Sequence, residues 1–293
     1  MRLILSRKGF DSASGGCPNP VLPDGRLLAL PIPDQQSPLC YGDIHDELDM
    51  ALLASQLTGK KMRRQGAHLD PDLIAGHRPR HPDWLPVLGQ HGSAEGHLQK
   101  QGVKEGDLFL FFGLFRPVER VARKWRFVPG TRARHCLWGW LQIGQVIDLS
   151  DPAACASVRD RYSEHPHLHG ERSSNNRLYV ARQRLSSRFL PAMAGAGQFR
   201  HLGEAGSLSD PAAAKPSQWR LPRWFFPDGR RPLSYHQKQE RWSCDAETCY
   251  LQAVARGQEF VLHLEDYPEA YAWCHALFAR EQRGPAAGNT AIF

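Results

Sequence analysis

The amino-terminal loop of the chain carries residue types that bind phosphate. Arg7 and Lys8 follow an apolar run, and small hydroxyl and glycine residues come next. Cations, hydroxyls and main-chain N–H groups together stabilise phosphate oxygens, although neither a Walker A ending nor a GxGxxG pattern is present. A polar loop that covers a sheet edge explains the same residues. The phosphate-binding candidates are Arg7, Lys8, Ser12, Ser14, Gly15 and Gly16.

A cluster of alternating histidines is a second candidate for chemistry. His165, His167 and His169 are spaced two apart, and Pro166 favours an extended chain in which they share one face. Imidazole groups exchange protons near neutral pH, so His167 is a candidate general acid or base or a phosphate contact. Surface histidines are the alternative. No recognised zinc-ligand spacing occurs around the histidines or the cysteines, so we expect no metal site.

Two carboxylates complete the acid/base candidates. Glu259 lies in the turn 256–261, at the start of an apolar run, and Asp11 lies inside the amino-terminal loop. In ADP-ribosyltransferase-type sites a carboxylate at a strand edge polarises a ribose hydroxyl, and an arginine such as Arg7 holds a pyrophosphate. An ordinary structural role for Glu259 is the alternative. The sequence contains no GxSxG motif, no Cys-His pair at a recognisable spacing and no paired-acid motif, so nothing in it indicates a hydrolase.

The charge of the chain favours polyanionic partners. Lys and Arg outnumber Asp and Glu by 37 to 30, which gives a net charge of +7. Such a surplus raises the local concentration of nucleic acid but carries no sequence specificity, and it also serves solubility. The basic residues are unevenly distributed along the chain. They gather at Lys60, Lys61, Arg63 and Arg64, and within residues 116–134 and 177–188.

Cysteine usage and hydropathy bear on the compartment. The seven cysteines are odd in number and scattered, which is typical of a reducing compartment. No apolar run reaches the ~18 residues of a membrane span, and the amino-terminal apolar run is too short for a signal peptide. We therefore expect a cytoplasmic protein without a membrane partner.

The elements that must position these residues are predicted from hydrophobic periodicity. The strongest pattern is a pair of apolar runs, 108–115 and 135–149, which predicts a strand hairpin with a long basic loop. Further strands are predicted at 2–6, 27–32 and 176–181 and a short one near Phe199. Helices are predicted at 43–56, with Asp43 as N-cap, and at 268–282. Residues 65–92 are rich in His, Pro and Gly and predict a loop, with a short helix at 71–75.

These elements predict an α+β fold. We expect a strongly bent sheet, mixed or antiparallel, with flanking helices in one domain over residues 1–283. Residues 284–293 are expected to form a flexible tail.

Several segments resemble a known family. The chain is similar to the type 3 nucleotide modification associated domain of bacteria and phages at residues 4–12 (ILSRKGFDS), 14–16 (SGG), 23–25 (PDG), 106–113 (GDLFLFFG) and 257–261 (GQEFV). The resemblance implies a role in a DNA base-modification pathway, with DNA or a nucleotide as partner and further proteins of that pathway as others. It leaves the reaction and the cofactor open.

A looser likeness covers residues 105–150. Their order of Gly-Asp, apolar strand, variable loop and GWLQIGQV is similar to PUA-like modules such as the EVE and YTH groups, which hold a modified base in an aromatic pocket. The likeness implies a PUA-like barrel core and a non-catalytic reader. Base stacking on an aromatic ring contributes ~1–3 kcal/mol. The stacking candidates are Phe112, Trp138 and Trp140. Aromatic strands are common in small barrels without this function.

Overall fold

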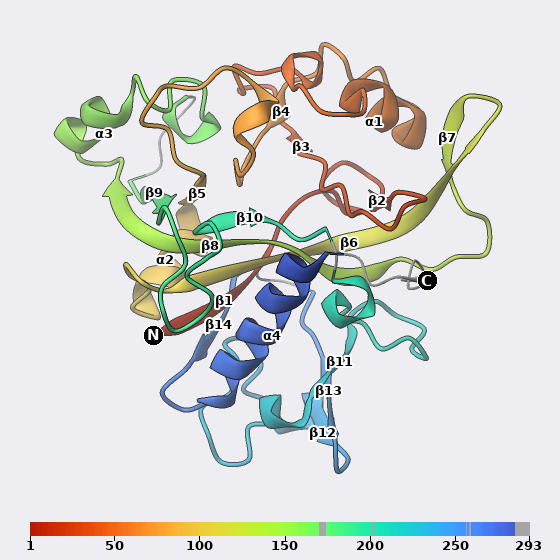
Figure 1. The fold of residues 1–293 in the computed structure, drawn as a ribbon, viewed down its shortest axis with the longest axis vertical. Coiled ribbons are helices and arrows are strands. Elements are labelled where there is room, and N and C mark those ends of the chain that lie inside the picture. The colour runs from red at the N-terminus through yellow and green to blue at the C-terminus, as the bar shows by residue number, and fades with distance from the viewer. Residues whose placement is uncertain (170–173, 201, 256, 258, 285–293) are drawn as a thin grey trace.

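A computed structural model describes residues 1–169, 174–200, 202–255, 257 and 259–284. Within them a nine-stranded sheet dominates the molecule (Figure 1). Its main path runs, in spatial order, through β14 (Glu259–His263), β1 (Arg2–Arg7), β6 (Leu108–Val121), β8 (Arg134–Asp148), β9 (Asn176–Ala181) and β5 (Val87–His91). Three short strands pair onto β6 or β8: β2 (Asn19–Val21), β7 (Lys124–Phe127) and β10 (Ala196–Gln198).

The sheet is mixed. Strand β1 runs parallel to β6 and antiparallel to β14, while β6, β8, β9 and β5 follow one another in antiparallel pairs. The predicted hairpin of the two apolar runs is therefore confirmed as β6 and β8, and the basic stretch between them contains β7. The predicted strands at 2–6 and 176–181 are confirmed as β1 and β9.

Both faces of the central strands are buried, which explains their continuous apolar runs. Leu108, Leu110 and Phe112 belong to one hydrophobic cluster, and the alternating Phe109 and Phe111 belong to another. A period of two places successive side chains on opposite faces of the sheet. The apolar run of β6 thus contributes to the core on both sides.

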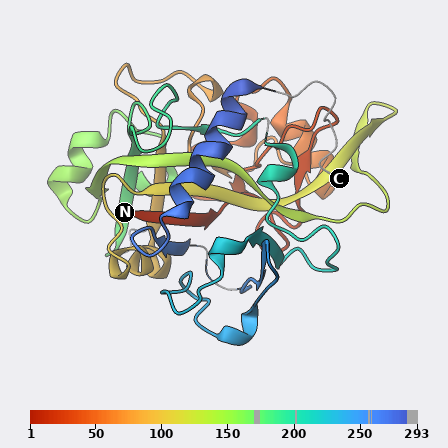
Figure 2. The same cartoon turned by 60° about the horizontal axis from the view of Figure 1, so that its bottom comes forward.

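Different segments cover the two faces. The segment that contains α1 (Met50–Thr58) lies on one face together with a two-stranded sheet of β3 (Ile32–Pro33) and β4 (Ala67–His68) (Figure 1). On the other face α4 (Glu269–Arg283) crosses the long strands (Figure 2), where Phe278 packs against Trp140. A small sheet lies below it, in the order β11 (Gln218–Pro222), β13 (Thr248–Gln252) and β12 (Trp242–Cys244).

The remaining elements are short helices. The α-helices are α2 (Gly92–Lys100) and α3 (Pro152–Val158). The 3-10 helices are η1 (Tyr41–Asp43), η2 (Ala75–His77), η3 (Pro166–Leu168), η4 (Gly203–Gly206), η5 (Arg223–Phe225) and η6 (Gln239–Arg241). No helix among the described residues is long and apolar enough to cross a membrane.

The sheet is bent so far that its two ends meet through side chains. Gln90 on β5, at one end of the path, donates from Nε2 to Glu259 Oε1 on β14, at the other end, over 2.6 Å. Among the described residues no backbone pairing joins β5 to β14, so the sheet is not a closed barrel. The expected α+β class is confirmed, and a PUA-like barrel core is not.

Three local predictions are wrong. The first helix begins at Met50, because the Asp49 side chain, and not Asp43, accepts the N–H of Leu52 as N-cap. Residues 27–32 form no continuous strand and contribute only a bridge at Leu27 and the start of β3. The segment 65–92 is more ordered than a loop, since it holds β4, η2 and β5. By contrast, the carboxy-terminal helix is confirmed as α4.

A buried asparagine anchors the amino-terminal loop to the sheet. Asn19 is 0% exposed, and its Oδ1 accepts the N–H groups of Phe10 and Leu30. Its Nδ2 donates to the carbonyl groups of Phe10 and Leu114. Gly9 adopts a φ of +89°, and a Cβ there would lie 2.9 Å from Asn19 Oδ1. The loop that begins with Lys8 is therefore held by side-chain hydrogen bonds.

We predict that Asn19→Ala lowers the free energy of unfolding by about 3 kcal/mol, because it leaves several buried main-chain groups without partners. Urea unfolding followed by circular dichroism measures this change. The exposed Gln35 serves as a control, and Gln35→Ala is expected to change the free energy by less than about 0.5 kcal/mol. A loss below about 1 kcal/mol in Asn19→Ala would contradict the anchoring role.

Candidate functional site

A polar cavity of about 190 Å³ opens where β1 ends. It receives side chains from the loop after β1, from β4 and the residues that follow it, from β5 and from η3. Its lining residues are Arg7, Lys8, Gly9, Asp11, Ser14, Ile32, His68, Asp70, Gln90, His91 and His167. Segments far apart in the sequence thus meet at the carboxyl end of β1.

Strand alternation aims the amino-terminal residues at this cavity. Ile4, Ser6 and Lys8 are spaced two apart, so they lie on the same face of the sheet. Ser6 is the register partner of Glu259 on β14, and its Oγ donates to Glu259 Oε1 over 3.0 Å. Lys8 Nζ lies 3.6 Å from the same oxygen. The strand pair β1 and β14 therefore places a lysine beside a buried carboxylate.

Glu259 lies behind the cavity and is 1% exposed. Its Oε1 accepts hydrogen bonds from Ser6 and Gln90, whereas Oε2 has no hydrogen-bond partner among the described residues. Burial raises the pKa of Glu259, and the charge of Lys8 acts against this rise. An oxygen without a donor is consistent with a carboxyl group that holds its proton more tightly than an exposed glutamate.

Asp70 is the anion at the centre of the cavity, and its side chain is 3% exposed although its main chain is partly accessible. Its Oδ1 accepts the N–H of Gly89 over 2.6 Å. Its Oδ2 lies 3.8 Å from His167 Nε2, 3.9 Å from His68 Nε2 and 4.0 Å from Lys8 Nζ. Burial opposes ionisation, but the neighbouring His165, Lys8 and His167 hold the pKa of Asp70 well below its usual range.

The imidazole of His167 is fixed from two sides. Its Nδ1 lies 2.7 Å from Asn176 Oδ1, and Asn176 Nδ2 donates to the main-chain carbonyl of His167. A Cβ on Gly89 would lie 2.3 Å from the ring, so only glycine on β5 admits this close approach. Burial lowers the pKa of His167 to about 3, which keeps the ring neutral.

Two further histidines border the cavity. His68 Nδ1 lies 2.8 Å from Asp34 Oδ2, and its ring centroid lies 5.5 Å from that of His167. His91 is exposed, and its ring centroid lies 5.3 Å from that of His167. Imidazole groups thus surround the buried carboxylate and reach the cavity mouth.

The structure brings several candidates from the sequence together. Lys8 and His167 line the cavity, and Glu259 lies directly behind Lys8. Arg7 also lines it, but its guanidinium donates to the main-chain carbonyls of Val254 and Ala255. Gln258, part of the motif that resembles the nucleotide modification family, lies outside the described residues.

Other polar groups of the amino-terminal loop form hydrogen bonds within the loop itself. The Asp11 carboxylate accepts the N–H groups of Ala13 and Ser14, and the Gly16 N–H donates to the Asp11 carbonyl. A Cβ on Gly15 would lie 2.4 Å from the Phe10 ring. Ser12 is exposed and does not line the cavity. Several N–H groups that a phosphate would need are therefore already bonded within the loop.

The three aromatic candidates lie apart from this cavity. Phe112 is 0% exposed and packs against Trp219 and Phe260, while Trp140 packs against Phe199. Trp138 lines a separate cavity of about 20 Å³ that is also bordered by Asp70 and Gly9. Stacking of a base on Phe112 or Trp140 would require core side chains to move.

The segment 65–92, where the central anion lies, was predicted as a loop and supplied no candidate. His68 and Asp70 are two residues apart, and this spacing places both side chains on one side of an extended chain. The same spacing at His165 and His167 predicts an extended chain, and this prediction is wrong, because residues Pro166–Leu168 form the 3-10 helix η3. Gln90 could not be predicted in this way, because a single glutamine in a short apolar strand indicates no particular function.

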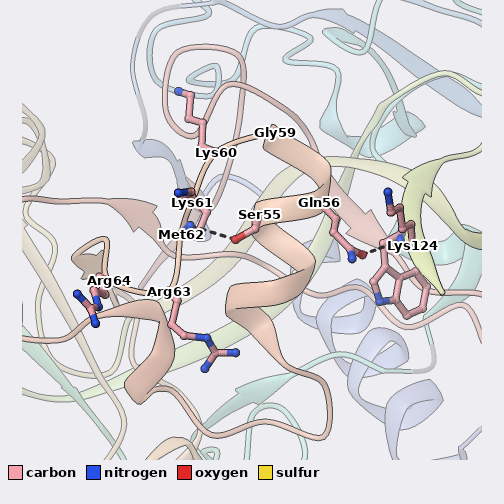
Figure 3. Close-up of a pocket in the computed structure, with 10 residues that line it drawn as sticks. Ser55, Gln56, Gly59, Lys60, Lys61, Met62, Arg63, Arg64 and Lys124 are labelled. Carbon is pink, nitrogen blue, oxygen red and sulfur yellow. Dashed lines mark hydrogen bonds between the residues drawn. The ribbon is translucent and has the colours of Figure 1, made fainter.

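A second cavity, of about 830 Å³, unites two of the basic clusters (Figure 3). The loop after α1 supplies Lys60, Lys61, Arg63 and Arg64, and β7 supplies Lys124 and Trp125. Two hydrogen bonds connect these parts: Trp125 N–H donates to Gln56 Oε1 on α1, and Met62 N–H donates to Ser55 Oγ. We call these four loop residues and Lys124 the basic surface.

The basic surface retains free positive charge. Arg63 pairs with Asp49, but Lys60, Lys61, Arg64 and Lys124 are exposed and form no salt bridge within the described part of the chain. The loop that carries four of these residues leads directly into β4, which bears His68. The elements on either side of this loop, α1 and β4, lie on the same side of the large sheet (Figure 1).

Comparison with known proteins adds a family. The family model described as nucleotide modification associated domain 3 matches residues 2–263, which include every residue of the polar cavity and of the basic surface. No curated protein and no solved structure matches the chain.

The raised pKa of Glu259 makes stability depend on pH in a defined direction. A carboxyl whose pKa is higher in the folded state stabilises the fold fully below its unfolded pKa of 4.5, and this contribution is lost as the pH rises through the folded pKa. We predict that Glu259→Gln gains stability relative to the wild type as the pH rises above about 4.5 and that the gain levels off above the folded pKa. Urea unfolding from pH 4 to pH 8 measures it; a difference that is constant or shrinks with pH would contradict the raised pKa.

Proposed function

The chain belongs to the nucleotide modification associated domain 3 family, and we propose that it binds DNA and modifies a base or nucleotide in the polar cavity at the end of β1. The observation that carries this proposal is the convergence of Lys8, Asp70 and His167 on that cavity. Buried titratable groups with shifted pKa values that meet in a cavity are typical of functional sites.

The size of the cavity favours a small part of the substrate. Its volume of about 190 Å³ is below the ~300–1,000 Å³ of pockets that enclose whole drug-sized ligands. One base or one phosphate group is a better match than a complete dinucleotide. An enzyme that acts on a base within duplex DNA has to rotate that nucleotide out of the stack, at a cost of a few kcal/mol. We therefore expect a single extruded nucleotide to enter.

Each side chain has a chemical role in this proposal. Lys8, whose side chain is 10% exposed, offers an ammonium that contacts a phosphate or transfers a proton. His167 presents Nε2 beside Asp70, and Ser14 adds a hydroxyl at the loop. Glu259 does not line the cavity itself but contacts two residues that do, Lys8 and Gln90, so it positions Lys8.

The basic surface supplies the affinity for the DNA backbone. Phosphates on a duplex lie along a line of negative charge, and Lys and Arg side chains that neutralise them release counterions. Four cations that have no acidic partner among the described residues line a cavity beside the hairpin of β6 and β7. Backbone contacts of this kind orient DNA without reading its sequence.

Two alternatives remain predictions. A reader that stacks a modified base on Phe112, Trp138 and Trp140 has less support, because those rings lie in or next to the core. A transferase that uses a cosubstrate such as NAD would need Glu259 to reach a ribose hydroxyl. Release of nicotinamide during incubation with DNA, and its loss in Glu259→Gln, would favour that transferase.

We predict that Lys60→Glu/Lys61→Glu weakens DNA binding on the order of tenfold or more in 100 mM salt. Each removed phosphate contact lowers the slope of log affinity against log salt by ~0.9, so the slope should fall by about 2. Fluorescence anisotropy with a labelled duplex, at several salt concentrations, measures both quantities. Lys8→Met should weaken binding with a slope change of about 1.

The matched control is Lys104→Glu/Lys215→Glu, which makes the same change in net charge at exposed lysines outside both cavities. We expect this control to retain nearly all the affinity of the wild type. Equal losses in the two double variants would assign binding to net charge alone. No affinity of the wild type for single-stranded or duplex DNA at 50 mM salt would contradict the proposed function.

A further inference from the structure

We propose that His68, Asp70 and His167 bind a divalent first-row transition-metal ion, such as Zn²⁺ or Fe²⁺, in the polar cavity. This inference rests on the proposed function and deepens it, since it names a cofactor for the same cavity. One ligand atom from each residue lies within 4.8 Å of the other two. The three residues match no recognised metal motif, because the ligands come from two distant segments.

The hydrogen bonds of the two imidazoles determine which nitrogen carries the proton. Asn176 Nδ2 donates to the His167 carbonyl, so its Oδ1 faces His167 Nδ1, which must be the protonated nitrogen. Asp34 Oδ2 accepts from His68 Nδ1 over 2.8 Å. These hydrogen bonds occupy both Nδ1 atoms, so the Nε2 atoms, which lie near Asp70, are the nitrogens that can bind a metal ion.

The two Nε2 atoms lie near the same carboxylate oxygen but form no hydrogen bond with it. Asp70 Oδ2 lies 3.8 Å and 3.9 Å from the Nε2 atoms of His167 and His68, which is too long for hydrogen bonds. A metal ion between the three atoms would use all of them as ligands. An ion at the usual ~2.0–2.2 Å from each ligand holds neighbouring ligand atoms ~3–4 Å apart.

The surroundings of the three ligands resemble those of built metal sites. Metal-binding histidines donate their other N–H to a carboxylate or carbonyl, as His68 does to Asp34 and His167 to Asn176. Asp70 Oδ1, the oxygen that does not face the two Nε2 atoms, accepts the Gly89 N–H. His165 Nδ1 accepts the His167 N–H, so the protonated Nε2 of His165 lies 3.4 Å from Asp70 Oδ1. His165 Nε2 is itself buried without a hydrogen-bond partner among the described residues.

Lys8 does not take the place of the ion. Its Nζ lies 4.0 Å from Asp70 Oδ2 and 3.6 Å from Glu259 Oε1, so neither carboxylate receives a close hydrogen bond from it. The charge of Lys8 therefore acts on both carboxyl groups, and Glu259 is the nearer one. Lys8 remains beside the cavity as the group that contacts the bound nucleotide or exchanges a proton with it.

The donor set indicates the class of metal. Two imidazole nitrogens and one carboxylate oxygen are the ligands of zinc and of non-haem iron, whereas magnesium and calcium prefer oxygen alone. Three protein ligands leave coordination positions open towards the cavity, where a nucleotide oxygen or water can bind. Bound metal would supply Lewis-acid or redox chemistry, and His167 would then act as a ligand, leaving Lys8 as the acid/base group.

The test is Co²⁺ titration of the full chain after dialysis against EDTA, followed by visible absorption, with Zn²⁺ competition and metal analysis by mass spectrometry. We expect one Co²⁺ per chain, displaced by Zn²⁺. Asp70→Asn and His167→Gln should lower the affinity about 100-fold or more. Asp34→Asn, which replaces the carboxylate that accepts from His68 Nδ1 with a neutral amide, should lower it about 10- to 100-fold. The control is His275→Ala, an exposed histidine on α4 that should leave affinity unchanged.

Circular dichroism and thermal unfolding check that each variant is folded, and Asp34→Asn provides the decisive result if the buried variants are not. Absence of Co²⁺ and Zn²⁺ binding by the wild type would overturn the proposal, as would Asp34→Asn binding as tightly as the wild type. If the wild type binds DNA but no metal, only the metal site fails. If it binds Co²⁺ but no DNA, the proposed function fails and the metal site stands.

Discussion

The rest of the site depends on the hydrogen bonds that the buried carboxylate of Glu259 accepts. Its Oε1 accepts from Ser6 on the neighbouring strand β1 and from Gln90 on β5, which is the far end of the sheet path. A low-dielectric interior strengthens these hydrogen bonds and makes any lost donor costly. The carboxylate therefore connects the two ends of an open sheet by hydrogen bonds and lies where the strong bend of the sheet brings these ends together.

This bend decides where chemistry can take place. The sheet brings the carboxyl end of β1 next to β5, so Lys8 and Gln90 reach the same cavity. The covering segment then adds Asp70 after β4, and η3 adds His167, which packs against the main chain of Gly89. Glu259 thus holds the wall of the cavity, while the residues that face its interior come from the segments that cover the sheet.

Much of this arrangement could be predicted from residue patterns, and the failures have physical causes. Lys8, His167 and Glu259 were identified because they lie beside periodic strands or in an alternating motif. Asp70 and Gln90 were missed because the segment 65–92 is full of His, Pro and Gly, which mask its short strands. Phe112 and Trp140 show how little residue type alone can indicate. A strand that is buried on both faces is as aromatic as the wall of a base pocket, and only packing separates the two.

The proposed function requires a nucleotide to enter the cavity between Lys8, Asp70 and His167. A crystal structure of the protein with a short DNA duplex tests it most directly. We predict density for one extruded nucleotide with a base or phosphate oxygen within ~3 Å of Lys8 Nζ, and the adjoining backbone along Lys60, Lys61 and Arg64. A duplex bound with all its bases stacked, on a face away from this cavity, would contradict the account.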